Sequence, residues 1–188
     1  VSLASGATVI IARYYGAKNK KDLNDTLHTA AALSIVGGII TTIIGIALAP
    51  VLLEMMKTPA DVMQDSVTYL RIYFAGIIFV FIYNVGSAIL RAVGDSTRPL
   101  YYLIVCCFIN IFLDILLVVG FGMGVAGAAI ATVISQVVSA VLVVHALMKS
   151  TDMYRLHPKE IRFHRFLLIS IVTIGLPAGI QSIMYNIS

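Results

Sequence analysis

Residues 100–119, LYYLIVCCFINIFLDILLVV, are the stretch that decides the fold. The run is as long as an α-helix that crosses the hydrocarbon core of a bilayer, which takes about 20 apolar residues. It carries one acid, Asp114, and one amide, Asn110. A carboxylate in hydrocarbon is costly unless it is paired, hydrated or protonated. The stretch therefore predicts a transmembrane helix whose acid has a function.

The composition of the whole chain leads to the same class of protein. Of the 188 residues, 60% are hydrophobic and 12% are charged, against about 25% charged in a soluble domain. The mean hydropathy is +0.98. The chain begins at Val1 and ends at Ser188 inside an apolar run, so we expect a piece of a longer membrane protein, truncated at both ends.

Apolar runs of membrane length recur along the chain. An all-β fold is excluded because the runs are too long and the turn signals too far apart. Four runs are long enough to cross a bilayer, and the first and last are expected to be parts of helices. The six runs are Val1–Ala12, Leu27–Leu53, Val67–Leu90, Leu100–Val119, Val125–Met148 and Phe166–Ser188.

Lysine and arginine predict the orientation of the helices. Eleven of the thirteen lie in the segments 13–25, 91–99 and 149–165, so these loops are expected to be cytoplasmic. The turn GFGMG at 120–124 then joins its two helices on the outer side. Segment 149–165 is the longest and most polar, and it is the expected boundary between two helical bundles. Because the basic residues are divided among loops, a nucleic-acid partner is excluded.

Asn110 and Asp114 are four residues apart, within about 40° of each other on one helix face. Thr132 lies on the next predicted helix, about 10 Å in from the outer turn, and Asp114 about 8 Å in. The third run adds Tyr69 and Asn84. Taken singly, Asn84 and Thr132 are more often helix–helix hydrogen bonds, and a tyrosine is more often a packing or interface residue. An acid within a membrane helix, by contrast, is functional by default.

These groups suit a coupling ion. Carboxylate, amide and hydroxyl oxygens are hard ligands suited to Na⁺, here at Asp114, Asn110 and Thr132. A desolvated carboxylate also suits proton binding and release. Na⁺ binding and proton binding are both properties of ion-coupled transporters. These residues do not distinguish Na⁺ from H⁺ as the coupling ion.

The remaining motifs give weaker evidence of function. GMGVAG at 122–127 spells the dinucleotide-binding pattern, but the next acid is Asp152, beyond an unbroken apolar run, so a tight turn and close helix packing are the better interpretation. Cys106 and Cys107 are interpreted as small apolar fillers. The histidines lack metal-ligand spacing. With no enzyme motif and one deep acid, a membrane enzyme is disfavoured.

Three motifs together resemble the multidrug and toxic compound extrusion (MATE) family. They are ARYYGAKN at 12–19, NVGSAILRAVGDSTRPL at 84–100 and GAAIATVISQ at 127–136. The resemblance implies an all-α membrane protein of twelve helices in two six-helix lobes. In this arrangement, residues 1–148 form the N-terminal lobe from partial helix 2 to helix 6. Residues 149–165 form the cytoplasmic linker between the lobes, and residues 166–188 form the start of helix 7 and of the C-terminal lobe.

The resemblance also implies a function. MATE proteins export organic cations and other drug-like compounds across the cell membrane in exchange for Na⁺ or H⁺, with no cofactor besides the coupling ion. The resemblance places the cation site at Asp114, Asn110, Thr132 and Tyr69, with Asn84 as a supporting polar residue. A second acid belongs to helix 1, which this sequence lacks. The expected partners are small amphipathic or cationic molecules, the lipid bilayer and the C-terminal lobe of the same chain, and the intact protein is expected to be a monomer.

One alternative function shares a related architecture. A flippase for lipid-linked precursors would need a strongly cationic central cavity. The predicted helices hold almost no Lys or Arg in their interiors, which favours the antiporter.

Overall fold

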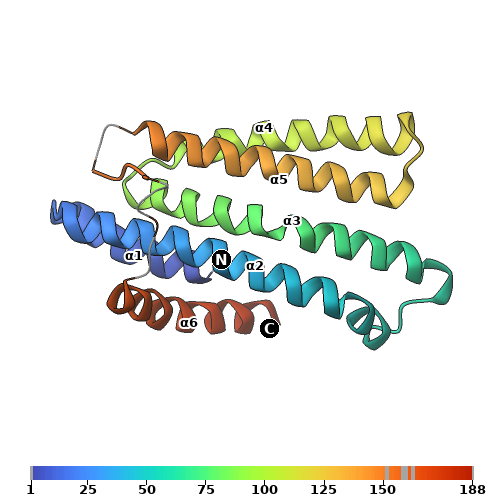
Figure 1. Ribbon diagram of the computed structural model, residues 1–188, viewed down its shortest axis with the longest axis horizontal. Helices are drawn as coiled ribbons and strands as arrows, with labels where there is room; N and C mark the ends of the chain where they lie inside the picture. Colours follow the sequence, from blue (N-terminus) through green and yellow to red (C-terminus); the bar gives the residue numbers. More distant parts are fainter. Residues whose placement is uncertain (1, 151–152, 158–160, 162–163, 188) are drawn as a thin grey trace.

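The computed structural model describes residues 2–150, 153–157, 161 and 164–187. Within these residues the chain is a bundle of helices without a strand, which confirms the all-α prediction. Figure 1 shows α4 and α5 side by side, α3 next to them and then α2; α1 packs against α2 and α3, and α6 packs against α1 and α2. The helices are α1 (Ser2–Gly16), α2 (Lys20–Met55), α3 (Ala60–Ala92), α4 (Thr97–Asp114), the π-helix η1 (Ile115–Gly120), α5 (Gly124–Lys149) and α6 (Arg165–Ile187).

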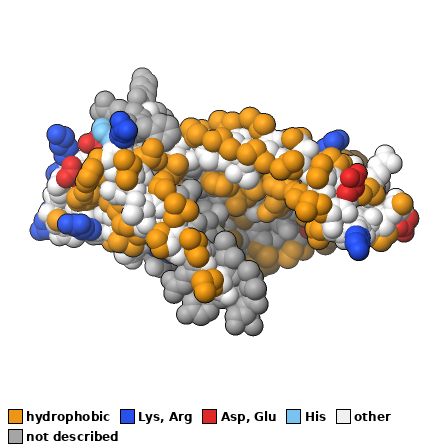
Figure 2. Space-filling view, turned by 90° about the horizontal axis from the view of Figure 1, so that it is seen from below, with side chains coloured by type: hydrophobic (Ala, Val, Ile, Leu, Met, Phe, Trp, Pro, Cys, Tyr) orange, Lys and Arg blue, Asp and Glu red, His pale blue; other side chains and the backbone are white. Residues whose placement is uncertain are grey.

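Four helical spans have the length and apolarity to cross a membrane: α2, α3, α4 with η1, and α5. They match the four complete runs expected from the sequence. In the described part of the face in Figure 2, hydrophobic side chains cover most of the middle, and charged side chains lie toward the two ends. This is the pattern of a multi-pass membrane protein, with an apolar surface against lipid and its charges in water.

The helices extend beyond the apolar runs. The loop expected at 13–25 shrinks, because α1 continues to Gly16 and α2 begins at Lys20. Asn19 caps α2 by accepting a hydrogen bond from the Asp22 backbone N–H at 3.3 Å, and its amide also donates to the Asp22 carboxylate at 2.8 Å. Hydropathy marks only the part of a helix that lies in hydrocarbon, whereas capping groups mark where the helix ends.

Small residues let the spans approach closely. A Cβ atom on Gly38 of α2 would lie 2.8 Å from the Ile78 Cα of α3, and one on Gly86 of α3 would lie 2.8 Å from the Val143 side chain of α5. Thr42 of α2 donates a hydrogen bond across the same interface to the Phe74 carbonyl at 2.9 Å. Small residues and interhelical hydrogen bonds drive helix association where the hydrophobic effect is weak.

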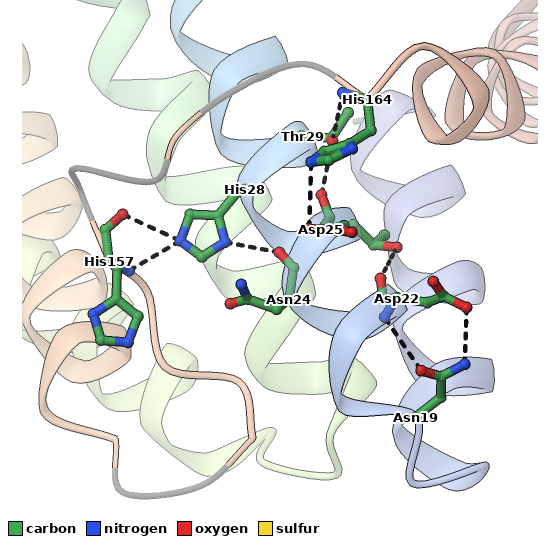
Figure 3. Close-up of polar contacts among 9 residues, drawn as sticks. Asn19, Asp22, Asn24, Asp25, His28, Thr29, His157 and His164 are labelled. Atoms are coloured by element: carbon green, nitrogen blue, oxygen red, sulfur yellow. Dashed lines mark hydrogen bonds and ion pairs between the residues drawn. The ribbon is translucent and has the colours of Figure 1, made fainter.

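The described part of segment 149–165 folds back onto α2 (Figure 3). The His157 backbone N–H lies 3.1 Å from His28 Nε2, and His28 Nδ1 lies 2.7 Å from the Asn24 carbonyl. The His164 backbone N–H donates to Thr29 Oγ1 at 3.2 Å. His28 is buried, so the segment is anchored on the first bundle. Residues 151–152, 158–160 and 162–163 of the predicted linker, and residues 1 and 188 at the ends, lie outside the described residues.

Candidate functional site

A cavity of about 170 Å³ lies where α3, α4 and α5 meet. Two of the predicted site residues, Asn110 and Thr132, line it together. Three further polar residues of α5 line it too: Ser135, Gln136 and Ser139. The remaining lining residues are Tyr83, Leu103, Cys106 and Cys107.

Three hydroxyls in this cavity present oxygen lone pairs. Thr132 Oγ1 donates its hydrogen to the Ala128 carbonyl at 3.0 Å. Ser135 Oγ donates to the Thr132 carbonyl at 2.7 Å, and Ser139 Oγ donates to the Gln136 carbonyl at 2.8 Å. A hydroxyl has one hydrogen and two lone pairs, so each of the three can act only as an acceptor toward the cavity. Among the lining residues there is no Lys or Arg, and this wall therefore favours a cation.

Asp114 lies one helical turn from Asn110 on α4, toward the turn at 120–124, and is not among the residues that line the cavity. Its Oδ1 atom is buried and has no hydrogen-bond partner among the described residues, and the same holds for Asn110 Nδ2. Buried polar atoms are nearly always paired, and an unpaired one costs about 1–3 kcal/mol. Two such atoms on successive turns of one helix mark a place where a ligand or a further group can bind.

The other two predicted site residues lie apart from this cavity. Asn84 donates to the Val80 carbonyl of its own helix at 2.8 Å. Tyr69 stacks on Tyr73, with ring centroids 6.3 Å apart and planes at 8°. Neither lines the cavity. The structure thus groups Asn110 with Thr132, places Asp114 one turn away, and gives Asn84 and Tyr69 partners on α3.

Seven of the nine lining residues were not predicted as site residues, among them Tyr83, Cys106 and Cys107. Cys106 and Cys107, interpreted as apolar fillers, both border the cavity, and Tyr83 closes it from α3 while its hydroxyl donates to the Pro99 carbonyl at 3.0 Å. Tyr83 is one position from Asn84, and the turn of the helix decides which of the two reaches the cavity. Among the described residues no cluster of three His, Cys, Asp or Glu side chains could hold a metal ion.

The helix changes its geometry directly after Asp114. Residues Ile115–Gly120 form a π-helix, in which the Phe121 N–H donates to the Leu116 carbonyl, five residues back, at 3.0 Å. From the sequence we expected one helix from Leu100 to Val119. Here the π segment ends the helix, directly before the turn at 121–123. π-helical segments are rare and are found frequently at functional sites.

Comparison with known proteins decides the family. The sequence model of the MatE family matches residues 1–116. The chain belongs to the MATE family. The probable multidrug resistance protein YoeA of Bacillus subtilis is 32% identical to it over 200 residues, covering 100% of this chain and 42% of YoeA. The chain thus spans less than half the length of that relative.

Solved MATE structures have the same fold. An inward-facing multidrug resistance MATE family transporter superposes with a TM-score of 0.87 at 29% identity, over 94% of this chain and 40% of that one. An outward-facing MATE family transporter superposes with a TM-score of 0.89 at 28% identity, over 99% of this chain and 42% of that one. This chain is therefore a multi-pass membrane protein with the arrangement of part of a MATE transporter.

Proposed function

We propose that this chain is the larger part of the N-terminal lobe of a cation-coupled antiporter that exports drug-like compounds from the cell. The observation that carries the proposal is the cavity between α4 and α5. Its Thr132, Ser135 and Ser139 hydroxyls donate to backbone carbonyls and can only accept from a ligand, and nearby lies an Asp114 carboxylate oxygen that has no partner among the described residues. Hard oxygen atoms of this kind bind Na⁺, and a carboxylate can take up H⁺. The named function of YoeA, multidrug resistance, supports export of small molecules.

Alternating access is the proposed mechanism. The chain superposes almost equally well on an inward-facing and an outward-facing transporter, which supports a lobe that keeps its fold while it rocks against a second lobe. The coupling ion would bind from the outside at Asp114, Asn110 and Thr132, and neutralising the carboxylate would favour the return of the lobe. Substrates would be amphipathic or cationic, since non-directional contacts reject little.

The sidedness, the domain division and the monomeric state belong to the same proposal. The basic end of the bundle, where Lys20, Arg91 and Lys149 lie, would face the cytoplasm. Segment 149–165 would join this lobe to a C-terminal lobe that starts with α6. The intact monomer would contain both lobes in one chain.

Transport by the full-length protein in proteoliposomes tests the proposal. Efflux of a fluorescent organic cation would be measured with a Na⁺ gradient alone, with a pH gradient alone, and with neither. We expect one gradient to drive efflux in the wild type and in Asp65→Asn, a matched change of an exposed acid on α3, and neither to drive it in Asp114→Asn. Gradient-driven efflux that is unchanged in Asp114→Asn would remove the proposed role of this acid.

The same assay separates the antiporter from the flippase. A flippase would move a lipid-linked substrate and would respond to neither gradient with efflux of organic cations. The part of the cavity wall that the structure describes carries no Lys or Arg, which supports the antiporter, because an anionic lipid-linked head group would call for cationic residues.

A further inference from the structure

The π-helix η1 is the feature of this lobe that neither the motifs nor the cavity explains. It begins at the residue after Asp114 and ends at Gly120, where the outer turn starts. Its hydrogen bonds span five residues instead of four, so it holds one residue more than an α-helical turn that would connect the same two ends. Such a segment can convert from a π-helix to an α-helix if its extra residue becomes part of the adjoining turn.

The outer turn holds η1 in its π form. The Leu117 carbonyl accepts a hydrogen bond from the Met123 N–H at 3.0 Å. Gly127 of α5 packs against this carbonyl, and a Cβ atom there would lie 3.2 Å from the Leu117 carbonyl carbon and oxygen. Gly122 and Gly124 have φ angles of +66° and +54°, which glycine adopts without strain. The π form is thus held by contacts made outside its own helix, and the glycine-rich turn is able to take up the surplus residue.

At its other end, η1 follows directly after Asp114, and Asn110 lies one helical turn earlier. Within the part of the chain that the structure describes, Asn110 Nδ2 and Asp114 Oδ1 are buried without hydrogen-bond partners. A rotation of α4 about its axis would change what these two atoms face. One residue of helix corresponds to about 100° of rotation, which is large enough to move a side chain from one neighbouring helix to the next.

We propose that η1 is a rotary joint: residues 115–120 exchange between π and α geometry, and this exchange turns Asp114 and Asn110 toward or away from the hydroxyls of α5 as the coupling ion binds. The inference rests on the proposed function, since the ion shifts the equilibrium only through its different affinity for the two forms. It adds to that function the structural element through which ion binding changes the lobe. The rest of the lobe keeps its packing while the end of α4 rotates.

Deletion of Val119 from the full-length transporter tests the joint. The Val119 side chain is 77% exposed, so its loss removes little packing, and five residues in α geometry then connect the same ends of the helix. We expect the deletion variant to fold, with a thermal midpoint close to that of the wild type, and to lose at least tenfold in ion-driven efflux. Val119→Ala, which keeps the residue count, is the matched control and is expected to transport as the wild type does.

Hydrogen exchange supplies a second measurement that needs no deletion. In the wild type we expect a saturating concentration of the coupling ion to change the protection of the amides of residues 115–121, and to leave the middle of α3 unchanged. In the deletion variant this change is expected to vanish. Unchanged protection at 115–121 in the wild type, or wild-type efflux in a folded deletion variant, would overturn the joint.

The outcomes also separate this inference from the function on which it rests. If the wild type shows no gradient-driven efflux, the antiporter proposal fails and the joint fails with it. If the wild type shows gradient-driven efflux and the ion leaves residues 115–121 unchanged, the antiporter proposal stands and the joint alone is overturned.

Discussion

Asn110 of α4 and Thr132 of α5 line one cavity, although they are 22 positions apart in the chain and the turn at 120–124 lies between them. The Thr132 hydroxyl donates its hydrogen to the Ala128 carbonyl, whereas the Asn110 amide nitrogen is buried without an acceptor among the described residues. The two side chains therefore differ in the hydrogen bonds that they can offer a ligand. Thr132 offers oxygen lone pairs, and Asn110 is in an unsatisfied state that a ligand or a rearrangement can relieve.

Replacing Asn110 by Leu should therefore stabilise the protein and impair its function. Removing the unpaired amide is expected to raise the free energy of unfolding by about 1–3 kcal/mol, measured as a higher thermal midpoint in detergent, while ion-driven efflux falls. Asn84→Leu is the matched control, because the Asn84 amide already donates to the Val80 carbonyl and no such gain is expected. A lower thermal midpoint for Asn110→Leu than for Asn84→Leu would contradict the prediction.

Replacing Thr132 by Val should weaken the response to the coupling ion. A polar contact to a charged partner contributes about 1.5–3 kcal/mol, and 1.4 kcal/mol is about tenfold in affinity. We expect the ion concentration for half-maximal efflux to rise about tenfold or more, and Thr132→Ser to restore it. Thr8→Val is the control, because Thr8 makes the same bond to a carbonyl four residues back outside the cavity; an equal shift in both variants would argue against a ligand role.

Two adjacent glycines of α2 should respond to alanine with opposite signs. A Cβ on Gly38 would lie 2.8 Å from the Ile78 Cα, a backbone atom that cannot move alone, so Gly38→Ala is expected to cost about 1–3 kcal/mol. A Cβ on Gly37 would lie 3.3 Å from the edge of the Phe81 ring, which can turn aside. Gly37→Ala should be neutral or gain up to about 1 kcal/mol from helix propensity. Thermal midpoints of the two variants decide the point, and equal midpoints would show that α2 and α3 do not pack as described.

Removing the His28 imidazole should release the segment that follows α5. His28 Nδ1 lies 2.7 Å from the Asn24 carbonyl oxygen, and His28 Nε2 lies 3.1 Å from both the backbone nitrogen and the carbonyl oxygen of His157. His28→Ala removes these contacts from a buried position. We expect trypsin to cleave faster after the exposed Arg155, whereas His145→Ala, a change of an exposed histidine, should leave the rate unchanged. Equal cleavage rates in the two variants would mean that other contacts hold the segment.

The fold was predictable because it depends on local composition. The runs beginning near Leu27, Val67, Leu100 and Val125 became the four membrane-length spans, since an uncharged run of that length has no favourable alternative to a helix in lipid. The helix ends were less predictable. The first turns of α2 contain Lys20, Lys21 and Asp22, which hydropathy assigns to a loop although they are helical.

The candidate site was predictable in part. The spacing of Asn110 and Asp114, and the short turn before Thr132, were enough to suggest that α4 and α5 share a polar cavity. Tyr83 was missed because its neighbour Asn84 carries the more conspicuous side chain, and only the rotation of α3 shows which of the two borders the cavity. The π-helix was missed because Ile115–Gly120 contains nothing that distinguishes it from an ordinary apolar helix.

The amino-acid sequence by itself determined the membrane spans and the position of one acid within them, because burial in lipid acts on each segment separately. The tertiary structure alone decided that Asn110 and Thr132 line a common cavity and that the helix after Asp114 is wound as π. Both depend on contacts between residues distant in the chain, such as the packing of Gly127 against the Leu117 carbonyl, and no local pattern encodes the rotation of one helix against another.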